Sequence, residues 1–182
     1  MIPELGHFAL ILALCISFVQ AVVPLVGAHR NRSALMAVAK PAAQGQFVFV
    51  AMSFAALTWA FVVNDFSVKY VASHSNSNLP LYYRITAVWG SHEGSLLLWG
   101  LILSLWTMAV SVFSSKLPDA VLARVLGVLG CVSVGFHSFL LVASNPFERL
   151  LPAAAEGMDL NPLLQDPGMI IHPPLLYMGY VG

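Results

Sequence analysis

Four stretches without a charged side chain constrain this sequence more than any other feature. They lie at about residues 8–28, 42–64, 95–115 and 125–144, and none contains Asp, Glu, Lys or Arg. Each has about the 20 residues that a helix needs to cross the hydrocarbon core of a bilayer. Because no water is present there to bond to the backbone, each stretch should be a helix. The sequence therefore predicts an all-α integral membrane protein with four complete transmembrane helices in one multi-spanning domain.

The overall composition agrees with this class and argues against others. Hydrophobic residues make up 59% of the 182 residues and charged residues only 9%, whereas a typical soluble domain has about 25% charged residues. The formal net charge is zero, so no nucleic-acid partner is expected. Cys15 and Cys131 lie in different predicted spans, and no Cys-x-x-Cys-His motif occurs. The chain is therefore not itself a c-type cytochrome.

A fifth apolar segment, at 171–182, has the pattern of the start of another transmembrane helix. Pro173 and Pro174 would stand in its first turn, where proline is tolerated and helps to position the start of a helix. The segment covers only about half of a membrane thickness. A chain that ended there would leave carbonyl groups without partners in the bilayer. We therefore expect further sequence beyond Gly182.

The basic residues indicate how the chain is oriented. Two loops, 29–41 and 116–124, carry most of them: Arg30, Arg32, Lys40, Lys116 and Arg124. Loops rich in Lys and Arg usually remain in the cytoplasm. The N-terminus and two long loops, about 65–94 and 145–171, are then expected on the outer face, with short interfacial helices. Since functional residues concentrate on loops held by a rigid scaffold, the outer face should carry the functional site.

His172 is the sharpest candidate for a metal ligand. It precedes Pro173, and a residue before proline is pushed toward extended geometry, which predicts that His172 lies just at the start of the fifth helix. The positive end of the helix dipole disfavours the imidazolium form there and leaves a neutral nitrogen available for iron. The alternative is an interfacial histidine that bonds only to the backbone.

A second candidate cluster lies in the motif WGSHEGSLLLWG at 89–100. His92 and Glu93 form an ionisable pair close to Trp89, where a glycine-containing outer loop becomes a transmembrane helix. Trp99 shares a helix face with a second tryptophan seven residues later. A haem needs a flat apolar wall and an axial ligand, and this cluster offers both. The alternative is the aromatic belt that membrane proteins carry at the interface.

His137 lies well inside the fourth predicted span. An ionisable residue at that depth is a candidate for function, and an imidazole can ligate haem iron. None of the four spans supplies a second histidine at the same depth. This favours a hydrogen-bonded core histidine of the kind found between membrane helices.

Five long motifs follow one another along nearly the whole chain: MIPELGHFALIL, VVNDFSVKYVASHSNSNLPLYYR, WGSHEGSLLLW, ARVLGVLGCVSVGF and LNPLLQDPGMIIHPPLLYMGYVG. Together, and in this order, they resemble the N-terminal part of the CcmF/NrfE family of cytochrome c biogenesis proteins. The third and fifth motifs are the most specific, because they are long and contain unusual runs of glycine, proline, histidine and tryptophan.

The resemblance implies a multi-pass protein of the bacterial inner membrane, with a periplasmic N-terminus, that handles haem in cytochrome c maturation. The family acts as a haem lyase, which receives haem from the chaperone CcmE. With CcmH and related subunits, it joins this haem to apocytochrome c. His172 matches a periplasmic histidine that the family uses as an axial haem ligand. The other candidate haem contacts are Trp89, His92, Glu93, Trp99 and Tyr177.

The resemblance also implies that the ligands of a second haem lie outside these 182 residues. The family holds a resident b-type haem between two intramembrane histidines, and both lie in sequence beyond residue 182. His137 matches neither of them. The 182-residue chain alone is therefore expected to lack lyase activity.

Two other functions stay open from the sequence. A membrane haem transporter or ion-translocating subunit would normally carry charged residues within its spans, and the four complete spans have none. A scaffold without a ligand would explain the spans and the aromatic belt, but it would give no role to the segment around His172.

Overall fold

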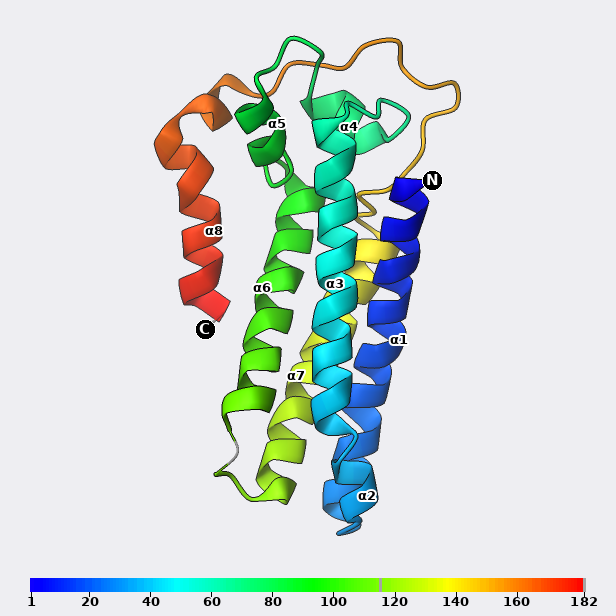
Figure 1. Ribbon diagram of the computed structural model, residues 1–182, viewed down its shortest axis with the longest axis vertical. Helices are drawn as coiled ribbons and strands as arrows, with labels where there is room; N and C mark the ends of the chain where they lie inside the picture. Colours follow the sequence, from blue (N-terminus) through cyan, green and yellow to red (C-terminus); the bar gives the residue numbers. More distant parts are fainter. Residues whose placement is uncertain (115, 182) are drawn as a thin grey trace.

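The computed structural model describes residues 1–114 and 116–181 and shows a bundle of long helices (Figure 1). The bundle consists of α1 (Ile2–His29), α3 (Ala39–Val62), α6 (His92–Phe113) and α7 (Asp119–Val142). These four helices are long and apolar enough to cross a membrane, the second together with the short α2 (Ser33–Met36) before it. Among the described residues there is no β-strand, only one isolated antiparallel bridge. The prediction of an all-α fold with four such helices is confirmed.

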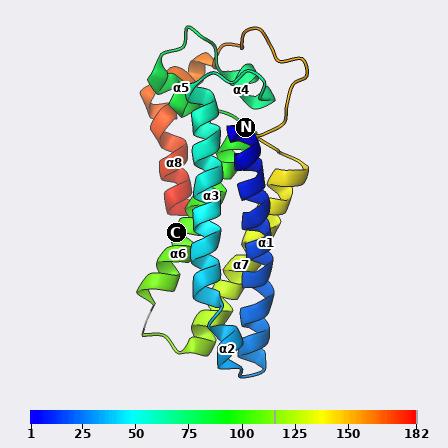
Figure 2. The ribbon, with the colours of Figure 1, turned by 45° about the vertical axis from the view of Figure 1, so that its right-hand side comes forward.

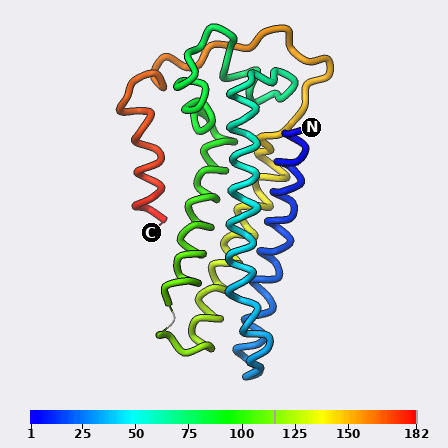
Figure 3. Tube along the Cα trace, viewed as in Figure 1, coloured from blue at the N-terminus to red at the C-terminus, as the bar shows by residue number. Residues whose placement is uncertain are grey.

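The shorter elements gather at the two ends of the bundle (Figures 1 and 2). The short α2 joins α1 to α3 at the end that carries the basic loops. At the opposite end, α4 (Lys69–His74), α5 (Leu81–Ala87) and the 3-10 helix η1 (Pro162–Gln165) form a cap together with the loop after α7. From this cap, α8 (Pro167–Val181) runs back alongside α6 and ends partway along the bundle (Figure 3).

Close packing of small residues brings α7 against α1. A Cβ atom added at Gly130 would lie 2.8 Å from the backbone nitrogen of Ala21 and 3.0 Å from the carbonyl carbon of Gln20. A Cβ atom at Gly127 would likewise lie 2.6 Å from Leu25 Cγ. Membrane helices associate mainly through such close van der Waals contact, because lipid tails leave no hydrophobic drive between them. The two glycines therefore set the distance between α1 and α7.

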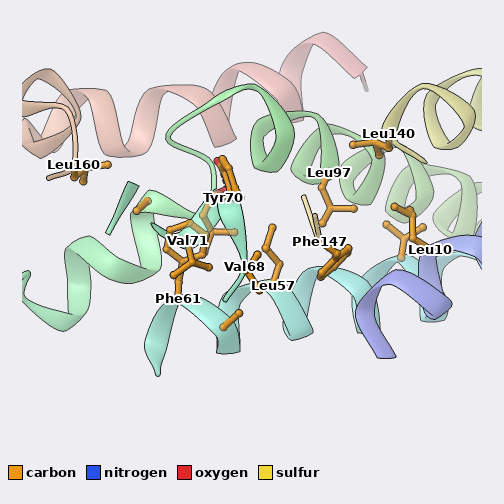
Figure 4. Packing of buried hydrophobic residues seen from close by; sticks show 14 of the residues in the cluster. Leu10, Leu57, Phe61, Val68, Tyr70, Val71, Leu97, Leu140, Phe147 and Leu160 are labelled. Carbon is orange, nitrogen blue, oxygen red and sulfur yellow. Dashed lines mark hydrogen bonds between the residues drawn. The ribbon is translucent and has the colours of Figure 1, made fainter. Parts of the chain in front are cut away.

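The buried apolar residues form two separate clusters rather than one continuous core. The larger lies toward the cap and includes Leu10, Leu57, Phe61 and Leu140 (Figure 4). The smaller lies toward the basic end and comprises Ala39, Ala43, Leu122 and Leu126. Along α3, the buried Gln46 lies between Ala43 of the smaller cluster and Val50 of the larger.

The cap is held together by polar contacts between two segments far apart in sequence. Residues 67–69 and 148–150 pair as an isolated bridge, with Lys69 N–H donating to the Glu148 carbonyl over 2.9 Å and Leu150 N–H to the Ser67 carbonyl over 2.8 Å. Arg149 forms ion pairs with Glu4 of α1 and with Asp65. The guanidinium group thus ties the first helix to both segments of the cap.

The start of α8 differs from the prediction. The helix begins at Pro167, several residues before the predicted start at 171, so Pro173 and Pro174 lie in its interior and not in its first turn. The Asp166 carboxylate accepts hydrogen bonds from the N–H groups of Gly168 (2.8 Å) and Met169 (3.4 Å). An Asp–Pro pair is a favourable helix start, because the carboxylate caps free N–H groups and proline needs no partner at the first position. That α8 begins a fifth span stays a prediction.

Gly130 offers a test of the packing. Gly130→Ala should destabilise the bundle by about 1 kcal/mol, because overpacking costs about 1–3 kcal/mol and exceeds the gain in helix propensity. Gly135, on the same helix, has nothing within 4 Å of an added Cβ atom and is the matched control. Gly135→Ala should leave the midpoint of thermal unfolding in detergent unchanged or slightly raised. Equal midpoints for the two variants would show that α7 does not approach α1 this closely.

Glu156 gives a test of the cap through pH. The hydroxyl group of Ser77 first, and then the N–H groups of Gly157 and Ser77, bond to the carboxylate and lower the pKa of Glu156. Because the pKa of Glu156 is lower in the folded protein, its carboxylate stabilises the fold at pH values above the ordinary pKa of a Glu side chain. This stabilisation is lost as the pH falls through the lowered pKa. The difference in thermal midpoint between the wild type and Glu156→Gln should therefore shrink on acidification. A difference independent of pH would contradict this contact.

Candidate functional site

The motif at 89–94 forms a fixed turn between α5 and α6. The phenol of Tyr70, on α4, donates a hydrogen bond to the Val88 carbonyl (3.0 Å) and accepts one from the Ser91 N–H (3.2 Å). Burial raises the pKa of Tyr70, so the phenol keeps its proton. A Cβ atom at Gly94 would collide with the Val88 carbonyl oxygen and the Tyr70 ring. The glycine is therefore needed for the close approach of this turn to α4.

Trp89 holds α8 at a point where the helix lacks a hydrogen bond of its own. Pro174 has no N–H group, so the carbonyl of Ile170, four residues earlier, has no donor within the helix. The indole N–H of Trp89 donates to this carbonyl over 3.0 Å. Two prolines inside a helix are tolerated when neighbouring groups satisfy the freed carbonyls. The sequence predicted Trp89 as a haem contact, and this stays a prediction; in the structure its indole N–H bonds to the backbone of α8.

Aromatic rings form the rest of the contact between α6 and α8. Trp99 stacks on Tyr177 with ring centroids 5.8 Å apart and planes 5° apart, and the Tyr177 hydroxyl bonds to Ser95 Oγ. Phe136 of α7 packs edge-on against Trp99 at 4.7 Å and Tyr180 does so at 6.1 Å. Trp99, Tyr177 and Tyr180 also line a small pocket between the two helices. Trp99 and Tyr177 thus pack between α6 and α8, and their contact with a haem stays a prediction.

Sequence reasoning missed Phe136 and Tyr180. Tyr180 follows Tyr177 by three residues, and residues three apart lie on one helix face, so the spacing could have indicated it. Phe136 comes from another helix, and no local signal links it to Trp99.

His92 turns away from α8. Its Nδ1 atom lies 2.9 Å from Ser144 Oγ, and its ring meets Phe139 edge-on at 5.9 Å. Both partners belong to the end of α7 and the loop after it. Glu93 is half-buried in the first turn of α6. The positive end of the helix dipole stabilises its negative charge there. The structure therefore does not bring this pair together with His172.

His172 lies in the interior of α8 and is exposed. The partly covered residues of α8 are Ile170, Pro173, Pro174, Tyr177 and Val181. At 100° per residue these share the face toward α6, and His172 falls on the opposite face. It therefore points away from Trp99 and Tyr177. The prediction that His172 lies at the start of the helix is wrong, because α8 begins at Pro167 and is capped by Asp166. The same early start places the two prolines in the helix interior.

His137 is buried in the middle of the bundle. Its Nδ1 atom lies 3.0 Å from Ser17 Oγ on α1, and Ser17 donates in turn to the Ala13 carbonyl over 2.8 Å. This is the arrangement of a hydrogen-bonded core histidine. Within residues 1–114 and 116–181, no group of three or more His, Cys, Asp and Glu side chains could hold a metal ion.

Known proteins with similar sequences include several cytochrome c biogenesis proteins. The family model for cytochrome C assembly proteins matches residues 89–182. The chain is 64% identical to the cytochrome c-type biogenesis protein CcmF of Pseudomonas aeruginosa and 56% identical to that of Escherichia coli, over its whole length. It is 47% identical to the cytochrome c-type biogenesis protein NrfE of Haemophilus influenzae. The chain spans 28% of the length of the two CcmF proteins and 29% of NrfE.

A solved structure agrees with the sequence comparison. The cytochrome c haem lyase CcmF superposes with a TM-score of 0.85 and 29% sequence identity, which covers the whole of this chain and 28% of that one. The family match covers α6, α7 and α8, the helices that carry most of the aromatic contacts described above. The chain therefore belongs to the cytochrome C assembly protein family, as its resemblance to CcmF and NrfE implied.

Proposed function

We propose that this chain supplies part of the haem-handling surface of a cytochrome c biogenesis protein, at the periplasmic face of the bacterial inner membrane. The observation that carries the proposal is His172, an exposed imidazole on the outward face of α8 within the part that matches the family. A similar solved protein is a haem lyase, and haem iron takes imidazole as an axial ligand.

The outward face of α8 has the chemistry that a haem needs. Leu175 and Gly179 follow His172 at spacings of three and seven residues and share its face. Leu175 is 65% exposed, and an added Cβ atom at Gly179 would touch nothing within 4 Å. The face therefore combines one nitrogen donor with a smooth apolar strip. A haem bound there would supply the vinyl groups for covalent attachment to a cytochrome.

The protein groups around α8 then have a positioning role. Trp89 bonds to the carbonyl two residues before His172, and Tyr177 stacks on Trp99 below it. These contacts fix the rotation of α8 about its axis and so keep the imidazole directed outward. In the proposed function Trp89, Trp99 and Tyr177 hold the ligand helix, and His172 binds the iron.

The partners follow from the family. We propose that haem reaches His172 from the chaperone CcmE, and that CcmH and related subunits bring the apocytochrome c to the same face. A resident b-type haem, with ligands beyond the 182 residues, belongs to the same proposal.

The role of His172 can be tested in a chimera. Residues 1–182 of this chain would replace the matching part of the Pseudomonas aeruginosa CcmF in cells that lack their own. His172→Ala should reduce the yield of c-type cytochromes with covalent haem by about tenfold or more, since a loss of about 1.4 kcal/mol in binding is a factor of ten. Added imidazole should restore part of the yield. The measurement is haem staining of separated membrane proteins.

His29→Ala is the control for this experiment. His29 is exposed, like His172, but lies at the other end of the bundle, so its loss should leave the yield unchanged. If His172→Ala instead lowered the abundance of the chimera, and imidazole had no effect, the residue would be structural and the proposal wrong.

Orientation in the membrane is a separate prediction. Alkaline phosphatase fused after Asn78 or Gly157 should be active, because both positions lie in the cap and are proposed to be periplasmic. Fusions after Arg32 or Asp119, at the basic end, should be inactive. The reverse pattern of activity would place the cap and His172 in the cytoplasm and would exclude the proposed site.

A further inference from the structure

A pocket of about 200 Å³ opens at the basic end of the bundle, the end opposite to the cap. It forms where α2 and the start of α3 meet the start of α7, and Figure 2 shows these three segments at one end of the molecule. Eight residues line the pocket: Ser33, Met36, Ala37, Ala39, Lys40, Asp119, Leu122 and Ala123. None of them belongs to the candidate site around α8.

The pocket has an apolar floor and a polar rim. Three of its residues are at most 3% exposed and form the floor: Ala39, Leu122 and Ala123. Ser33, Lys40 and Asp119 are exposed and bring a hydroxyl group, an ammonium group and a carboxylate to the same opening. A single ligand in the pocket therefore meets one positive charge, one negative charge and an apolar surface.

The two charges of the rim are not paired within the protein. Each of the four ion pairs among the described residues contains Glu4, Asp65 or Glu148, at the cap end. Lys40 and Asp119 take part in none of these pairs, although both line one pocket. Each of the two side chains can therefore bind a group of the opposite charge that enters the pocket.

The pocket lies at the level of the lipid headgroups. The span that contains α3 has 30 residues and α7 has 24, whereas about 20 helical residues cross the hydrocarbon core. Lys40 is the last charged residue before the uncharged run of α3, and Asp119 lies in the first turn of α7, before its uncharged run. Both charges are therefore expected at the boundary between hydrocarbon and water.

We propose that this pocket binds the headgroup of a phospholipid with a primary ammonium group, phosphatidylethanolamine. Lys40 binds the phosphate of the headgroup, and the Ser33 hydroxyl donates a hydrogen bond to it. The Asp119 carboxylate accepts hydrogen bonds from the ammonium group, which has three hydrogens to donate. The two methylene groups between phosphate and ammonium lie on the apolar floor.

A purely anionic lipid would use only part of this pocket. Arg30, Arg32, Lys116 and Arg124 are also exposed at this end, and such clusters attract anionic lipids to a membrane protein. That attraction needs no pocket, and the carboxylate of Asp119 opposes an anion inside it. A headgroup with both charges uses both sides of the rim. The inference does not depend on the role in haem handling or on which side of the membrane the basic end lies.

The preference can be measured by native mass spectrometry of the 182-residue chain, released from detergent with one phospholipid added at a time. Phosphatidylethanolamine should bind with a Kd about two- to fivefold lower than phosphatidylcholine with the same acyl chains, the range that an exposed ion pair gives. Both lipids have the phosphate, but the trimethylated nitrogen of choline has no hydrogen to donate. Equal affinities, or tighter binding of phosphatidylcholine, would overturn the proposal.

Three variants separate the two charges. Asp119→Asn should abolish the preference for phosphatidylethanolamine and leave the affinity for phosphatidylcholine unchanged. Lys40→Ala should weaken the binding of both lipids by a similar factor, because both carry the phosphate. Lys116→Ala is the control and should leave the preference intact, since Lys116 is exposed at the same end but does not line the pocket. A preference that survives Asp119→Asn would contradict the proposal. If a variant does not fold, the comparison of the two lipids on the wild type decides.

A soluble analogue tests whether the ligand is a lipid. Glycerophosphoethanolamine has the same headgroup without the acyl chains. At the same concentration it should form no detectable complex, because it lacks the apolar contacts that hold a lipid beside the helices. A complex as stable as that of the phospholipid would show that the pocket takes a soluble ligand and would overturn the assignment.

Discussion

The middle of a bilayer offers no water to bond to the peptide backbone, and the whole architecture follows from this constraint. Four helices satisfy their own backbone groups over the length of the bundle, and irregular segments occur only at the two ends. Since burial of apolar surface gives little drive between helices in lipid, the helices associate through close contacts of small residues such as Gly127 and Gly130. The polar contacts that a soluble protein would spread over its surface are concentrated in the cap, where Arg149 joins α1 to both long segments.

The same constraint explains how α8 can carry two prolines in its interior. Proline removes a backbone donor, and the carbonyl that it leaves free must find another partner. At Ile170 that partner is the indole of Trp89, from the turn before α6. Trp89 and the proline pair at 173–174 are far apart in sequence. Together they fix the orientation of α8, because the indole bonds to a carbonyl that the prolines leave free. Because His172 lies between these contacts, its outward direction depends on them.

The aromatic residues and the histidines lie on different surfaces of the helices. Trp99 and Tyr177 lie between α6 and α8, whereas His172 lies on the far face of α8 and His92 bonds to the loop after α7. A haem held by His172 would therefore contact the outward strip of α8 and not the Trp99–Tyr177 stack. In the structure, the contacts of Trp99 with Tyr177 join α6 to α8.

The sequence by itself determined the class of protein, the four long helices and the family, because uncharged runs of membrane length and long motifs are local properties of the chain. It also favoured a core position for His137, since none of the four spans has a second histidine at the same depth, and the structure shows His137 buried and bonded to Ser17. The tertiary structure alone decided where the candidate residues point. The helix α8 begins at Pro167 and not at the predicted residue 171, because the Asp166 carboxylate caps free N–H groups at this position. Trp89 became a partner of α8, and Phe136 joined Trp99, because such contacts depend on how separate helices pack, which no spacing within one helix encodes.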